Sequence, residues 1–157
     1  MDFLVKVLVV YETKYGNTKI VAETIAEGIR EVKAIETVLS EVKQVDLKKI
    51  PDYDAILIGS PNHFGGPIGG VKQFIDKLGK LNLSEKGVAV FDTYLGNGFF
   101  QKAVKKMEDR INEKAPGLKL MAPGLSIRVK GSKGPIEEGE LPKCKEFGNE
   151  IANQLKP

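Results

Sequence analysis

Residues 3–18 read FLVKVLVVYETKYGNT, and this stretch decides the fold class. Its first part, up to Tyr11, is almost continuously Val and Leu, as is typical of a central strand that is buried on both faces of a sheet. The polar residues that follow contain one glycine and lead into residues 20–32, where apolar side chains recur at helical spacing. A buried strand, a short loop and an amphipathic helix begin a βαβ unit.

The same alternation of apolar runs and amphipathic segments continues to the end of the chain. Further strands are predicted at residues 38–42, 54–60, 87–92 and 118–129. The last of these is interrupted by Pro123 and Gly124, and Pro142 is tolerated in the first turn of a final helix over residues 141–155. The pattern predicts an α/β fold, a parallel sheet with helices on both faces, and one domain over residues 1–157.

The cysteine and histidine content restricts the chemistry. Cys144 is the only cysteine and His63 the only histidine. An internal disulfide is therefore impossible, and a zinc site of the Cys/His kind lacks ligands. Cys144 lies on the apolar stripe of the last helix, which favours a core role over a reactive one. Any redox chemistry must then come from a bound cofactor.

Charge and hydropathy point away from nucleic acid and membrane partners. The net charge is only +3, and the basic residues are spread along the chain instead of forming a dense patch. The first apolar run is too short for a membrane span, and Asp2 and Lys6 give the wrong flanks for a secretory signal. We therefore expect a cytoplasmic protein with no nucleic-acid or membrane partner.

Three loops are candidates for a binding site, because ligands of open α/β sheets bind outside the carboxyl ends of the strands. They are residues 12–18, 61–70 and 93–98. The first loop leads into a helix N-terminus, where backbone N–H groups and the helix dipole suit a phosphate. It matches neither GxxxxGK[ST] nor GxGxxG, so a terminal monophosphate fits best. A plain turn in which Asn17 or Thr18 caps the helix remains an equal alternative.

These segments resemble the flavodoxin family. Residues 11–18 (YETKYGNT), followed by VAETIA at 21–26, resemble the FMN-phosphate loop and first helix of flavodoxins. Residues 59–66 (GSPNHFGG) resemble the second flavin loop, in a form shared with flavodiiron modules and flavodoxin-like quinone reductases. Residues 125–131 (LSIRVKG) are most similar to the flavodiiron modules. The family usually has Thr or Ser where this chain has Lys14 and Tyr15, and its members are usually acidic.

The resemblance implies a flavodoxin-like, doubly wound, five-stranded parallel sheet of order 2-1-3-4-5. It also implies noncovalent FMN and a role as a one- or two-electron carrier between redox proteins. An NAD(P)H-dependent quinone reductase and a flavin-binding sensor on the same fold remain alternatives.

In the second loop, His63 or Phe64 is expected to cover the flavin, while a glycine contacts its N5 position. Tyr94 is expected to stack on the ring. No catalytic residue and no metal ligand is predicted. The expected cofactor-binding residues are Thr13, Lys14, Tyr15, Gly16, Asn17, Thr18, Pro61, Asn62, His63, Phe64, Gly65, Gly66, Thr93, Tyr94, Leu95, Gly96 and Asn97.

Overall fold

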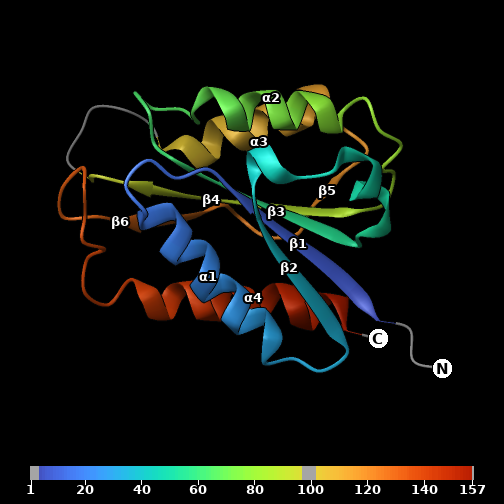
Figure 1. The fold of residues 1–157 in the computed structure, drawn as a ribbon, viewed down its shortest axis with the longest axis horizontal. Helices are drawn as coiled ribbons and strands as arrows, with labels where there is room; N and C mark the ends of the chain where they lie inside the picture. Colours follow the sequence, from blue (N-terminus) through green and yellow to red (C-terminus); the bar gives the residue numbers. More distant parts are fainter. Residues whose placement is uncertain (1–3, 97–101, 157) are drawn as a thin grey trace.

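The computed structural model describes residues 4–96 and 102–156, which form a twisted parallel sheet between two layers of helices (Figure 1). The strands are β1 (Val5–Tyr11), β2 (Ile35–Glu41), β3 (Ala55–Pro61), β4 (Gly87–Tyr94), β5 (Lys119–Leu120) and β6 (Leu125–Arg128). The α-helices are α1 (Asn17–Arg30), α2 (Gly69–Leu78), α3 (Ala103–Lys114) and α4 (Leu141–Leu155). Two short 3-10 helices, Val42–Gln44 and Leu47–Asp52, connect β2 to β3.

The sheet order is β2-β1-β3-β4-β5, with β6 also paired to β4 and all pairings parallel. This confirms the predicted order, because β5 and β6 occupy the same position beside β4. From β1 the chain adds β2 on one side and then β3, β4 and β5 on the other. The strand order therefore reverses between β1 and β3, and ligands of doubly wound folds bind at such a switch point. β1, β3, β4 and β6 all end at this carboxyl edge, which lies on the left of Figure 1.

Each face of the sheet carries its own hydrophobic core, because successive strand residues point to opposite faces. On β1, Val7 and Val9 pack into the core beneath α1 and α4, whereas Leu8 and Val10 pack into the core beneath α2 and α3. All four side chains are buried. Burial on both faces explains why this strand reads as a continuous apolar run instead of alternating with polar residues.

The last predicted strand is divided in two, which differs from the single interrupted strand expected over residues 118–129. Gly87 and Val88 of β4 pair with β5, and residues from Phe91 onward pair with β6. Residues 121–124 between these pairings contain Pro123, which has no N–H to donate to a ladder. The segment therefore leaves the sheet and rejoins it as β6. The second strand begins earlier than predicted, at Ile35, and β4 extends to Tyr94.

Helices α1 and α4 pack unusually closely on one face of the sheet. A Cβ on Gly28 would overlap the Lys145 carbonyl, and one on Gly148 would overlap the Ile25 carbonyl. The two glycines let the helix backbones touch. On the other face, the Arg110 guanidinium of α3 makes two hydrogen bonds of 2.8 and 2.7 Å to the Asp76 carboxylate of α2.

Every helix in the described ranges is too short or too polar to span a bilayer.

Candidate functional site

A cavity of about 580 Å³ opens at the carboxyl edge of the sheet. This volume lies within the roughly 300–1,000 Å³ that is usual for small-molecule sites. Residues from all three predicted loops line it, together with the residue before α3 and residues from the loop after β6. The lining residues are Thr13, Lys14, Tyr15, Asn17, Thr18, Pro61, Asn62, His63, Phe64, Ile68, Thr93, Tyr94, Leu95, Gly96, Lys102, Val129 and Ser132.

The loop after β1 is shaped to present backbone N–H groups. Gly16 has φ of 94°, a left-handed conformation that favours glycine, and its N–H donates to Thr13 Oγ1 at 2.9 Å. It is the N-cap of α1, and no side chain caps the helix. The predicted alternative in which Asn17 or Thr18 caps α1 is therefore wrong. The first N–H groups of a helix have no partner within it, so they are available to an anion in the cavity.

Thr18 links the first loop to the end of β4. It lies in the first turn of α1, is only 1% exposed, and its Oγ1 is 2.9 Å from Thr93 Oγ1. A hydroxyl can donate one hydrogen bond and accept two. Thr18 can therefore keep its bond to Thr93 and still donate to a ligand in the cavity.

The loop after β3 contains a tight turn. His63 N–H donates to Gly66 O at 2.7 Å, Gly66 N–H donates back to His63 O at 3.1 Å, and Phe64 and Gly65 between them have φ of 52° and 83°. Positive φ at both central residues is the pattern of a type I′ turn, and it is uncommon for an aromatic residue. The His63 and Phe64 rings meet edge to face with centroids 4.7 Å apart. The turn holds Phe64 at 73% exposure beside the cavity.

Beneath the end of β4 lies a buried carboxylate. Asp92 is fully buried, and its Oδ2 accepts the N–H of Val104 at 3.0 Å in the first turn of α3. Burial raises the pKa of Asp92 to about 6. Its Oδ1 has no hydrogen-bond partner in the described part of the chain. Asp92 thus joins the strand to the start of α3, next to Lys102 of the cavity wall.

The loop between β6 and α4 forms another wall of the cavity. Val129 N–H donates to Tyr94 O at 2.9 Å, and an isolated bridge between Val129 and Ile136 folds the loop back on itself. The loop also approaches the start of α1 closely at Gly134. A Cβ added to this glycine would lie 2.6 Å from Asn17 Oδ1. The loop therefore joins the end of β4 to the start of α1.

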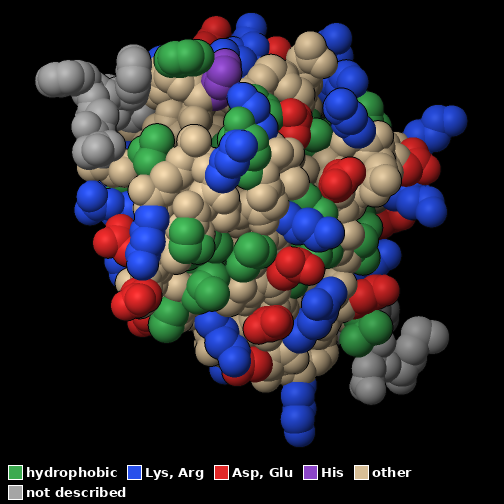
Figure 2. Space-filling model, turned by 60° about the vertical axis from the view of Figure 1, so that its left-hand side comes forward, with side chains coloured by type: hydrophobic (Ala, Val, Ile, Leu, Met, Phe, Trp, Pro, Cys, Tyr) green, Lys and Arg blue, Asp and Glu red, His purple; other side chains and the backbone are tan. Residues whose placement is uncertain are grey.

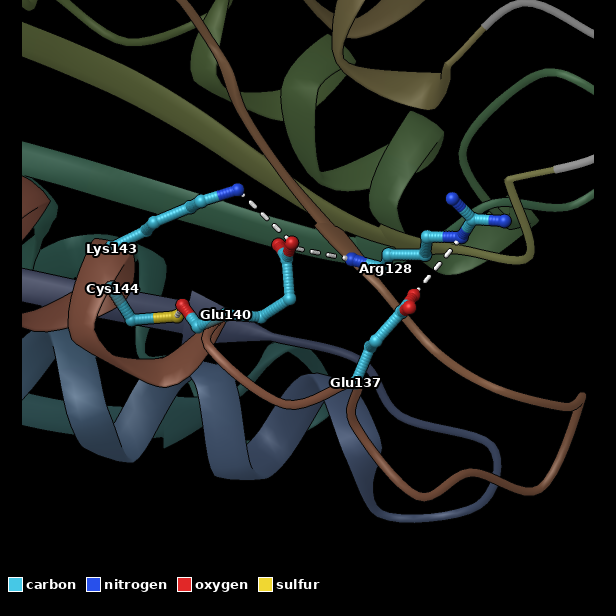
Figure 3. A network of polar contacts seen from close by, with 5 residues as sticks. All are labelled: Arg128, Glu137, Glu140, Lys143 and Cys144. Atoms are coloured by element: carbon cyan, nitrogen blue, oxygen red, sulfur yellow. Dashed lines mark hydrogen bonds and ion pairs between the residues drawn. The ribbon is translucent and has the colours of Figure 1, made fainter.

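Polar contacts fix the base of this loop (Figure 3). Arg128 Nε pairs with Glu137 Oε2 at 3.0 Å, while the Arg128 backbone N–H donates to Glu140 Oε2 at 3.4 Å. Glu140 Oε1 accepts from Lys143 at 3.0 Å. Cys144 lies beside them, fully buried, and burial raises the pKa of its thiol to about 12. A thiol in this state is not nucleophilic at neutral pH, which agrees with the predicted core role.

Most of the predicted site residues line the cavity together. Gly16, Gly65 and Gly66 shape the loops without lining it. Asn97 lies outside the described residues. Sequence reasoning missed four lining residues: Ile68, Lys102, Val129 and Ser132. Val129 and Ser132 could have been found, because the predicted last strand also ends at this carboxyl edge.

Comparison with known proteins agrees with this geometry. The sequence model of the flavodoxin domain matches residues 8–129. The chain belongs to the flavodoxin family. It is 30% identical to oxidised Flavodoxin 2 from Bacillus cereus, with 96% of this chain and 99% of that one covered and a TM-score of 0.81. A flavodoxin from the domain Archaea is 28% identical, with 98% and 100% covered and a TM-score of 0.82.

The flavodiiron protein from Giardia intestinalis shares the fold. The match covers 98% of this chain and 37% of that longer chain, at 20% identity and a TM-score of 0.79. Flavodoxins are FMN-binding electron-transfer proteins, so FMN is the cofactor of this chain. The cavity suits it chemically, because uncapped N–H groups, Lys14 and aromatic side chains lie around it. Among the residues that the structure describes, no carboxylate lines it.

Proposed function

We propose that residues 1–157 form one cytoplasmic FMN-binding domain that carries one or two electrons at a time between redox proteins. The observation that supports this best is the cavity itself, where two loops that resemble the flavin loops of the family meet the end of β4 beside the uncapped N–H groups of α1. FMN supplies the redox chemistry when bound, and the protein positions the cofactor and tunes its electrostatic surroundings.

The loop after β1 would hold the phosphate. Its residues Thr13 to Thr18 combine a left-handed glycine, the N-terminus of α1 and the Lys14 ammonium group. Each of these favours an anion, since the helix N-terminus carries partial positive charge and unpaired donors. The buried Thr18 hydroxyl adds a donor that the fold already orients through Thr93.

The loops after β3 and β4 would hold the flavin ring. Tyr94 is half-buried at the end of β4, with the Lys102 Nζ atom 4.9 Å from its ring centroid. β3 pairs with β4, and His63 and Phe64 lie in the loop after β3. In our proposal Tyr94 stacks on the ring and the His63 and Phe64 pair covers it elsewhere. Pro61, Asn62, Leu95 and Gly96 complete the walls.

An anaerobic spectroscopic experiment separates a carrier from an NAD(P)H-dependent reductase. The FMN-loaded protein should keep its yellow colour for minutes with excess NADPH alone, and it should bleach on stoichiometric dithionite, which shows that the flavin is competent. Rapid bleaching by NADPH, with the colour restored by a quinone, would contradict the carrier function and support the reductase.

A further inference from the structure

Lysines surround the mouth of the cavity on the side of the first loop. The Nζ atoms of Lys14 and Lys133 lie 5.5 and 5.9 Å from the Tyr15 ring centroid, and both side chains are exposed. Tyr15 itself lines the cavity and is 46% exposed. Residues far apart in the sequence thus bring two ammonium groups to one aromatic side chain.

Two more lysines come from α3 and the residue before it. Lys102 lines the cavity beside Tyr94, and Lys106 lies against the turn after β3, its Cδ 3.3 Å from the position of a Cβ on Gly66. Both are exposed. We call Lys14, Lys102, Lys106 and Lys133 the lysine rim. Within residues 4–96 and 102–156, no carboxylate forms an ion pair with any of them.

The nearby carboxylates make no ion pair with the lysine rim in the described residues. Glu137 pairs with Arg128 at 3.0 Å and Glu138 with Lys130 at 3.8 Å. Asp92 is fully buried under the start of α3. Glu12 turns towards the start of α2, and its Oε1 atom is buried. None of these carboxylates pairs with the lysine rim, so the rim itself presents positive charge at the mouth. Figure 2 shows blue basic side chains beside the purple His63, with red acidic side chains also near it.

Exposed apolar side chains lie inside the rim. Phe64 is 73% exposed and Leu95 is 44% exposed, and both line the cavity together with Tyr15. The left-handed backbone at Phe64 is unfavourable for a residue with a side chain, and it holds a large ring exposed to water. An apolar centre with a charged border is the usual anatomy of a protein–protein interface.

We propose that the lysine rim and its apolar centre are the docking surface for a redox protein with an acidic face. The proposal rests on the carrier function and adds the charge of the partner. A small anionic cofactor such as a pyridine nucleotide would meet one or two ammonium groups. The rim instead spreads its charges over α3 and the loops after β1 and β6, around exposed rings that a protein surface can cover.

Charge at such a surface acts mainly on the rate of association. Electrostatic steering raises association rates by about 10–1,000-fold at low salt. It weakens as salt shortens the range of the field, to about 8 Å at physiological ionic strength. An acidic partner should therefore react faster at low salt, and a basic partner faster at high salt.

Two small iron proteins of opposite charge test the proposal. The FMN-loaded, fully reduced protein is mixed in a stopped-flow instrument with an acidic rubredoxin or a basic cytochrome c. Each acceptor takes one electron as its Fe(III) becomes Fe(II). One fully reduced flavin in its anionic form therefore reduces two acceptors and releases one proton to water. The rubredoxin rate should fall at least severalfold between low and high salt, and the cytochrome c rate should rise.

Charge-reversal variants test whether the salt dependence of the electron-transfer rate arises at the lysine rim. Lys106→Glu/Lys133→Glu changes two exposed side chains that do not line the cavity, and Lys48→Glu/Lys49→Glu makes the same change in net charge at the opposite end of β3. The rim variant should lose roughly tenfold in rate with rubredoxin and gain with cytochrome c. The control should stay near the parent. Flavin absorbance and circular dichroism confirm that each variant is folded and loaded.

The remaining outcomes overturn the proposal in different ways. Equal effects of the two double variants, or rates that do not depend on salt, would show that the rim has no special role. NADPH bleaching that the rim variant loses would assign the lysines to a nucleotide instead. A protein that reduces neither acceptor, although dithionite reduces its flavin, would contradict the carrier function itself.

Discussion

At the scale of single residues, Thr18 is the side chain that most directly couples the fold to the cofactor. Thr18→Val should weaken FMN binding more than it weakens the fold, because a hydroxyl bond to a charged phosphate contributes about 1.5–3 kcal/mol. That range corresponds to roughly a 10- to 150-fold rise in the Kd for FMN. Fluorescence titration of the FMN-free protein measures it.

The control for this prediction lies on the same helix. Thr24 also carries a hydroxyl, which donates to Ile20 O at 2.8 Å and does not line the cavity. Thr24→Val should leave the Kd for FMN unchanged. An unchanged Kd in Thr18→Val as well would mean that the Thr18 hydroxyl serves only its bond to Thr93.

Asp92 predicts a pH dependence of stability. Burial raises its pKa from 3.8 to about 6, so the folded protein binds this proton more tightly than the unfolded chain does. Asp92 therefore opposes folding increasingly as the pH rises through that window. Asp92→Asn should be more stable than the parent above pH 6, by up to about 3 kcal/mol, and the difference should vanish near pH 4. Urea unfolding of the FMN-free protein at several pH values measures it.

Asp76 should affect the pH dependence of stability in the opposite direction to Asp92. Its hydrogen bonds from Arg110 lower the pKa of Asp76, so this carboxylate contributes stability above its unfolded pKa and loses it as the pH falls. Asp76→Asn should therefore destabilise the protein at neutral pH and have less effect in acid. If both variants shifted stability in the same direction at pH 7, the account of Asp92 would be contradicted.

At the scale of helices and strands, the contact between α1 and α4 makes a specific prediction. The methyl group of Gly148→Ala would overlap the Ile25 carbonyl, so the two helices must move apart. Such overpacking costs about 1–3 kcal/mol of unfolding free energy. Gly69→Ala, in the first turn of α2, is the control because its methyl group would meet nothing within 4 Å. Thermal unfolding should show a lower Tm for the first variant and an equal or higher Tm for the second.

The strands also show what the sequence could and could not predict. The buried run that ends at Tyr11 was recognisable because a strand covered on both faces needs apolar side chains on both. The division into β5 and β6 was not, since it depends on where each segment meets β4. Leu120 pairs with Val88 and Leu125 pairs with Phe91 on β4. The segment between Leu120 and Leu125 is two residues longer than the segment of β4 between their partners, so it must leave the sheet.

The site was predictable where loops follow strands and hidden where distant segments meet. Residues from the loops after β1, β3 and β4 were expected at the cavity from topology alone. Lys102 and Ser132 reach it because α3 starts over Asp92 and because the loop after β6 folds back on the first loop. Such contacts follow from tertiary packing, and local sequence patterns carry no signal for them.

At the scale of the whole molecule, the electron-carrying role depends on one bound group. The single thiol is buried in the core beneath α1 and α4, where burial raises its pKa to about 12. A large cavity opens at the carboxyl edge of the sheet. A positive rim surrounds the mouth of that cavity although the net charge of the chain is only +3. The central claim is therefore that FMN binds in this cavity with its phosphate at residues 13–18.

Flavin selectivity of the stripped protein tests this claim most directly. Acid releases the pigment for mass spectrometry, and the FMN-free protein is then titrated with FMN, riboflavin and FAD. The account predicts that the pigment is FMN at one per chain, and that FMN binds at least 10-fold more tightly than riboflavin, since each 1.4 kcal/mol from the phosphate contacts is a factor of ten. FAD as the natural pigment, or equal affinity for FMN and riboflavin, would contradict it.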